Sequence, residues 1–155
     1  MKKHAGVMML GAAIAVAPVM TANAEENISL LFVEMSPSVT MADGILTLEQ
    51  TDDEMIWFSD RPQRVAGKIS TADFLSAWEQ GADSFASDPP NATLFGNTEA
   101  GEVATVVTVS NARETEAGIA FDYVVLEGEE HGTWSDVALF IDSTFSKLFT
   151  VKHKY

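Results

Sequence analysis

Alternation of apolar and polar residues in short runs is the dominant pattern along the chain, and it predicts a protein built mainly of β-strands. The first run, Ile28 to Met35, is rich in β-branched and large apolar residues, and the alternation resumes at Val39 after Ser36-Pro37-Ser38. Asp43-Gly44 is the strongest hairpin signal, because both residue types tolerate the positive φ angles of a two-residue turn. Further strands are expected over residues 45–49, 55–58, 65–69, 103–109, 119–126 and 137–141.

One segment has helical spacing instead. Phe74, Leu75 and Trp78 would share one face of a helix, and Ser70-Thr71 just before them can accept hydrogen bonds from its first amide groups. Gly81 is a natural end for this helix. At about ten residues the helix is too short to be stable alone, so its apolar face is expected to pack on a sheet.

Residues 83–97 are expected to be irregular. Pro89-Pro90 removes two amide donors and fixes an extended path, which excludes a central strand. Only Thr93 to Phe95 is expected to pair briefly. The whole pattern predicts a mainly β fold at the margin of the α+β class, in which a single antiparallel sheet or sandwich-like domain carries one short helix.

The first 24 residues have the features of a secretory signal peptide. Lys2 and Lys3 precede a short apolar run over 7–20, and Ala22-Asn23-Ala24 supplies the small residues of a cleavage site. The apolar run is too short for a comfortable membrane span, although an uncleaved anchor is the alternative. We therefore expect a signal peptide over 1–24, a β-rich exported domain over 25–142 and a C-terminal tail of ambiguous structure over 143–155. The expected location is periplasmic or secreted, by bacterial export.

The charge of the chain limits its partners. The formal net charge is −14, and removal of Lys2 and Lys3 would change it to −16. Such a charge argues against binding of nucleic acid or of an anionic membrane, both of which require basic surfaces. It suits a cationic partner or divalent ions, although a solvated acidic surface is the simpler explanation. The chain has no cysteine, which excludes disulfides and thiolate chemistry.

The most unusual stretch runs from Trp57 to Gly67 and places Arg61 and Arg64 on either side of Pro62. Each guanidinium matches a carboxylate, so we interpret the stretch as a rigid corner whose arginines are held by carboxylates from a distant loop. The functional alternative is a site for an anionic ligand with an aromatic wall. The predicted polar cluster consists of Trp57, Ser59, Asp60, Arg61, Arg64, Asp83, Asp88 and Asn91.

Catalytic and metal sites receive less support. Ser59 and Asp60, with His131 as base, could suggest a hydrolase, but adjacent side chains leave an extended chain on opposite faces. Calcium could use Asp52-Asp53-Glu54 or the acidic residues of 127–130, yet neither has the spacing of an EF-hand loop. We therefore expect no catalytic residue, no metal site and no cofactor.

Two motifs resemble an uncharacterised family of small exported bacterial proteins. The resemblance runs over residues 45–126 and is carried by the corner, Trp57-Phe58-Ser59-Asp60-Arg61-Pro62, and by the loop, Asp88-Pro89-Pro90-Asn91-Ala92. It implies that the two motifs belong to one site, because they occur together in the family. It implies no activity.

These observations favour a periplasmic, non-enzymatic binding or accessory module with an unknown protein or small-molecule partner. The alternatives are a small hydrolase or isomerase using Asp60 or Asp88 beside Arg61 and Arg64, and a calcium-dependent assembly module. A carboxylate with a raised pKa that lies in a cleft away from any arginine would favour the enzyme. The oligomeric state does not follow from the sequence.

Overall fold

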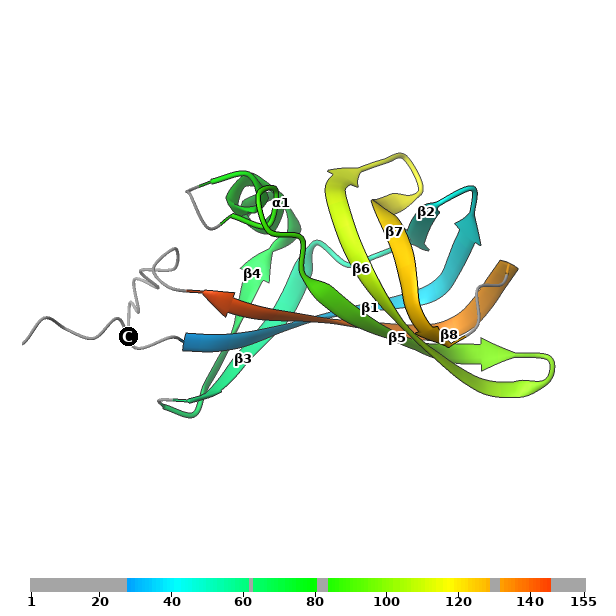
Figure 1. Ribbon diagram of the computed structural model, residues 1–155, viewed down its shortest axis with the longest axis horizontal. Helices are drawn as coiled ribbons and strands as arrows, with labels where there is room; N and C mark the ends of the chain where they lie inside the picture. The colour runs from blue at the N-terminus through cyan, green and yellow to red at the C-terminus, as the bar shows by residue number, and fades with distance from the viewer. Residues whose placement is uncertain (1–27, 62, 81–83, 129–131, 146–155) are drawn as a thin grey trace, which may run out of the picture.

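The protein is described by a computed structural model covering residues 28–61, 63–80, 84–128 and 132–145 (Figure 1). The predicted signal peptide and the tail beyond residue 145 lie outside this part of the chain. The elements are β1 (Ile28–Ala42), β2 (Ile45–Glu49), β3 (Glu54–Arg61), β4 (Val65–Ser70), α1 (Thr71–Trp78), β5 (Asn91–Thr98), β6 (Gly101–Glu114), β7 (Gly118–Gly128) and β8 (Gly132–Phe145).

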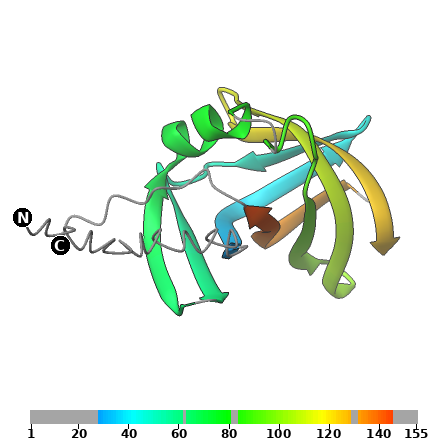
Figure 2. The same ribbon diagram turned by 60° about the vertical axis from the view of Figure 1, so that its left-hand side comes forward.

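The strands form one eight-stranded antiparallel sheet in the order β2-β7-β6-β5-β8-β1-β3-β4. Because β2 also pairs with β1, the strands β1, β2, β7, β6, β5 and β8 form a closed ring. The β3–β4 hairpin extends from the ring and is attached along the first half of β1 (Figure 2). The predicted class, a mainly β protein with one antiparallel sheet and one short helix, is confirmed.

β1 changes its neighbour halfway along its length. It pairs with β8 from end to end, but on its other edge residues 29–33 pair with β3 and residues 38–42 pair with β2. Residues 34–37 therefore lie where β2 and β3 diverge, and we call this stretch the fork. Pro37 falls here, where its missing amide donor breaks no pairing with β2 or β3. The fork allows β1 to continue through Ser36-Pro37-Ser38, where the sequence pattern predicted an interruption.

α1 closes one end of the structure beside the fork and the hairpin (Figure 2). Ser70 caps it as predicted, since its side chain accepts a hydrogen bond of 3.0 Å from the Asp73 amide. The helix ends at Trp78, before the predicted end at Gly81. Phe74 packs on Phe32 of β1, with ring centroids 5.0 Å apart, which confirms that the helix packs on the sheet.

The Asp43-Gly44 hairpin is confirmed. Both residues have positive φ angles, 54° and 76°, and β1 and β2 pair on either side of them. Such a turn brings the strands together with the right-handed twist that the sheet requires.

β5 corrects the expectation of an irregular segment over 83–97. It lies inside the sheet between β6 and β8, with Ala92 and Leu94 buried. The prolines do not prevent this, because both precede the first residue of the strand, and the Pro90 carbonyl accepts a 3.0 Å hydrogen bond from the Val109 amide. β8 also runs to Phe145, three residues past the end predicted for the domain.

Candidate functional site

The described members of the predicted polar cluster do not meet in one place. Arg64 forms an ion pair with Asp60 at 2.8 Å, within the tip of the β3–β4 hairpin. The two side chains are 88% and 65% exposed, so water screens this pair. The hairpin tip and α1 lie at opposite ends of β4 (Figure 1).

The loop members of the cluster have local partners. The Asp88 amide bonds to the Ser84 carbonyl at 2.9 Å, and the Asn91 side chain accepts a 3.1 Å hydrogen bond from Thr108 on the neighbouring strand. In the described part of the chain no ion pair joins Arg64 to Asp88. The side chain of Arg61, and Asp83 altogether, lie outside that part, so their predicted pairing stays a prediction.

Trp57 belongs to the core of the hairpin. It is buried and lies opposite Gly67 on β4, and a Cβ atom at Gly67 would be only 2.7 Å from its ring. The ring therefore covers the space that a side chain at position 67 would need. Ser59, two residues further along β3, is buried as well. These contacts give the corner motif a packing role.

The residue that sequence reasoning missed is Glu34, at the fork. It is 1% exposed, and its Oε2 atom is buried without a hydrogen-bond partner. A buried acceptor of this kind is unusual, because nearly all buried polar atoms in folded proteins are hydrogen-bonded. The sequence carries a signal for it: Glu34 follows Leu30 and Phe32 at the inward positions of an alternating strand, where an apolar residue is expected.

Glu34 lies at a hollow that opens at the fork. This fork hollow has a volume of about 560 Å³. Its lining includes three consecutive acidic residues, 52–54, which end the β2–β3 connection and begin β3, and apolar residues of β1 and β3. The lining residues are Val33, Glu34, Met35, Asp52, Asp53, Glu54, Ile56 and Lys68.

The pKa of Glu34 is raised from 4.5 to about 8. Burial is the larger cause, because it removes the carboxylate from water, and the negative charge of Asp52 is the second. Glu34 is consequently a neutral carboxylic acid at pH 7. No ion pair of the described residues includes it, and Lys68 on the rim is already paired with Glu54 at 3.2 Å.

α1 fixes the acidic wall of the fork hollow. The Thr71 amide donates a 2.8 Å hydrogen bond to the Asp53 carbonyl, and the Thr71 hydroxyl donates one of 3.1 Å to the Asp52 carbonyl. The first residue of the helix thereby holds the backbone that carries both carboxylates. The side chains of Asp52 and Asp53 remain exposed, so their charge reaches solvent at the mouth of the hollow.

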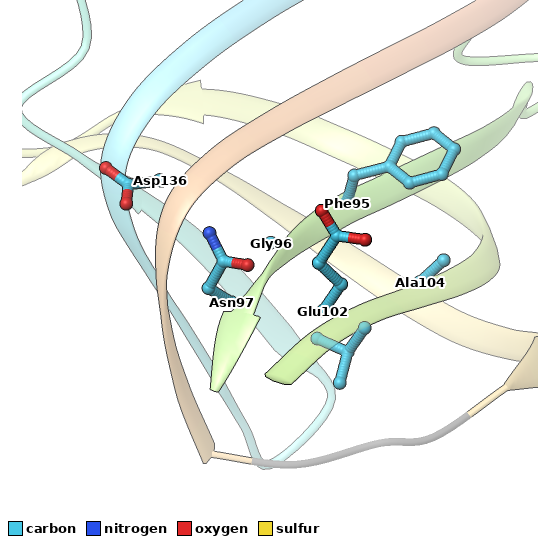
Figure 3. Close-up of a pocket in the computed structure, with 7 residues that line it drawn as sticks. Phe95, Gly96, Asn97, Glu102, Ala104 and Asp136 are labelled. Atoms are coloured by element: carbon cyan, nitrogen blue, oxygen red, sulfur yellow. The ribbon is translucent and has the colours of Figure 1, made fainter. Parts of the chain in front are cut away.

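A second hollow, of about 340 Å³, lies on the outer face of β5, β6 and β8. We call it the β5–β6 hollow. Figure 3 shows Phe95 and Asp136 at opposite ends, with Asn97 and Glu102 between them. Asp136 has a φ angle of 50°, at the point where β8 bends opposite Pro37. This hollow combines an exposed aromatic ring with two carboxylates.

Within the described residues, no group of three or more His, Asp or Glu side chains is arranged to hold a metal ion. His131, the base considered for a hydrolase, lies outside the described residues. In the same part of the chain, no helix has the length and apolar character needed to cross a membrane.

Fold and site together define a mainly β protein with a closed antiparallel ring and an acidic hollow around a buried carboxylic acid. Comparison with protein-family models, with curated proteins and with solved structures gives no match for the chain. The resemblance of its two motifs to a family of exported bacterial proteins stays a prediction.

Proposed function

We propose that the protein is an exported binding module that holds a small organic cation in the fork hollow. The observation that carries this proposal is Glu34, which lines an acidic hollow and has a buried oxygen without a hydrogen-bond partner among the described residues. Export rests on the features of residues 1–24 and would place the module in the periplasm or outside the cell.

The lining of the fork hollow supports an amine as ligand. The Glu34 Oε2 atom is buried in the free protein, and an ammonium group that entered beside it would supply the hydrogen-bond donor that it lacks among the described residues. Asp52 and Asp53 would attract a second positive charge at the mouth. Val33, Met35 and Ile56 also line the hollow, on the outer face of the sheet, and provide an apolar surface for the carbon chain.

Proton release would accompany binding. Glu34 is neutral at pH 7, and a cation placed against it stabilises the ionised form, so the proton leaves when the ligand enters. Binding of an amine should therefore strengthen as the pH rises towards 8. Below that pH the apparent affinity should fall by about tenfold per pH unit, because the proton competes for the same carboxylate.

The same pKa favours a second candidate, an enzyme in which Glu34 transfers protons. A pKa of about 8 lets a carboxyl group both donate and accept a proton near neutral pH. Glu34 lies in a hollow and away from any described arginine partner, which is the arrangement that distinguishes the enzyme from a structural role. Its acid–base group would be Glu34, in place of Asp60 or Asp88.

The proposal is tested by calorimetric titration of the purified chain with 1,5-diaminopentane at pH 6, 7, 8 and 9. Titration in two buffers that differ in ionisation enthalpy measures the protons released. We expect affinity to rise with pH, about one proton to leave at pH 7, and Glu34→Gln to abolish both effects. Glu99→Gln, which changes an exposed carboxylate on the β5–β6 turn, is the matched control. Affinity that does not depend on pH or on Glu34 would rule the proposal out.

A further inference from the structure

The outer face of the sheet carries an apolar surface that none of the elements in the described part of the chain covers. Residues paired across antiparallel strands point to the same face, so the register shows which side chains are neighbours. Phe95, Ala138 and Met35 form one row across β5, β8 and β1. Phe140, Val33 and Ile56 form the next row across β8, β1 and β3. We call these six residues the outer band.

Three of the six residues of the outer band are exposed large side chains. Met35 is 55% exposed, Phe95 48% and Ile56 46%, and the Phe95 and Phe140 rings meet edge to face at 5.6 Å. Single exposed hydrophobic residues are common, but a contiguous patch that joins neighbouring strands is typical of a protein interaction surface. Val124 and Leu126, by contrast, are exposed on β7, outside these two rows.

An acidic hollow adjoins the outer band on each side. Phe95 borders the β5–β6 hollow with Glu102 and Asp136 (Figure 3), and Met35 borders the fork hollow with Asp52 and Asp53. Met35 and Phe95 are two strand spacings apart, which is about 10 Å. On an α-helix, residues seven apart are separated by about the same distance.

We propose that the outer band binds a basic amphipathic segment of a partner protein, with apolar side chains on the band and a lysine or arginine at each hollow. The charges select this partner. A second copy of the chain would bring the same carboxylates together, and an anionic membrane would be repelled by them. This docking site shares the fork hollow with the proposed amine site, but it depends on Phe95 and the β5–β6 hollow and does not depend on Glu34.

The test uses a fluorescent 18-residue peptide with a leucine face and lysines seven residues apart, and a matched peptide with glutamate at those positions. Anisotropy with the full chain should show binding of the lysine peptide alone. Phe95→Ser and Glu102→Lys should each weaken it by about tenfold or more, which is the effect of an interface anchor. Val124→Ser should leave binding unchanged, and circular dichroism should show that all variants fold.

Other results would overturn the proposal. Equal binding of the two peptides would mean that charge does not select the partner. Equal effects of Phe95→Ser and Val124→Ser would mean that the net charge of −14 attracts the lysine peptide without a specific site. Sedimentation that shows a dimer lost in Phe95→Ser would assign the band to a second copy. Binding of the chain to vesicles containing phosphatidylserine through the band would assign it to a lipid surface.

Discussion

Two carboxylates of neighbouring strands, Asp60 on β3 and Glu34 on β1, have opposite surroundings. Asp60 lies at an exposed hairpin tip and meets Arg64 at 2.8 Å in water. Glu34 is 1% exposed and has an oxygen without any partner. The pair at the tip gains little from its charges, because solvent and salt screen them. The buried group, which forms no ion pair with any described residue, is the one whose pKa moves to about 8.

The comparison shows that burial, rather than an unusual local motif, makes a carboxyl group chemically distinctive here. The hairpin tip is unusual in sequence because arginines are rare in this acidic chain, yet both side chains of its ion pair are exposed to water. Glu34 is not unusual in sequence, because it is one of 23 acidic residues. Its surroundings arise only when β1 passes from β3 to β2 and the loop that carries Asp52 comes to line the same hollow.

The largest predicted effect is the pH dependence of stability caused by Glu34. Between pH 4.5 and about 8 the folded chain keeps a proton that the unfolded chain releases, so the free energy of unfolding should fall as pH rises. The loss is at most about 5 kcal/mol, reached above pH 8. Urea unfolding followed by tryptophan fluorescence at pH 5, 7 and 9 measures it.

Glu34→Gln provides the control for this prediction. The glutamine amide does not ionise, so the variant should be more stable than the wild-type chain at pH 9. Its free energy of unfolding should also depend less on pH. The difference between the two profiles isolates Glu34 from the general repulsion of an acidic chain, which both proteins share. Parallel profiles would mean that Glu34 does not titrate as its burial requires.

The local elements of the fold follow from local sequence. Asp43-Gly44 determines the β1–β2 hairpin through its positive φ angles, and Ser70 determines the start of α1 through its bond to the Asp73 amide. Strand alternation identifies the inward residues of β6 and β7, such as Val107 and Phe121. Each of these depends on contacts between residues close in the chain, which a single sequence contains.

The closure of the ring and the position of β5 depend on distant contacts. β1 pairs with β8, and β2 with β7, across separations that no local pattern encodes. For the same reason the sequence pattern of Pro89-Pro90 predicts a loop, although the extended path that these prolines fix leads directly into a strand held between β6 and β8. The unpaired oxygen of Glu34 depends on these pairings too.

The corner motif has a structural explanation that composition does not reveal. The Trp57 ring leaves no room for a side chain at the position opposite it on β4. That position is Gly67, where an added Cβ atom would lie only 2.7 Å from the ring. A tryptophan and a glycine ten residues apart are a packing pair only if the chain reverses between them. The residues on either side of Arg61 and Arg64 are therefore explained by packing within the β3–β4 hairpin, whether or not the arginines bind a ligand.

A smaller effect is predicted for Asp52→Asn. Removing this charge should lower the pKa of Glu34 from about 8 but leave it well above 4.5, because burial is the larger cause of the shift. The variant should accordingly lose less stability than the wild-type chain as pH rises from 7 to 9. NMR titration of the Glu34 side-chain carbon measures the pKa directly, and a return to 4.5 would show that Asp52, not burial, dominates.

The smallest effect is predicted for Arg64→Ala. The ion pair with Asp60 is exposed on both sides, so its loss should change the free energy of unfolding by less than about 0.5 kcal/mol, and added salt should reduce even that. Urea unfolding at low and high ionic strength measures the change.

Arg113→Ala is the matched comparison for Arg64→Ala. Arg113 meets Asp122 at 3.1 Å with side chains only 34% and 46% exposed, and it also donates to the Asn111 carbonyl at 2.9 Å. Its loss should therefore destabilise the chain more than the loss of Arg64, since a less exposed carboxylate and a carbonyl lose a donor. If Arg64→Ala instead has the larger effect, or weakens the binding of 1,5-diaminopentane, the hairpin tip has a partner beyond Asp60. The contrast between an exposed, paired tip and a buried, unpaired fork would then no longer describe the two sites.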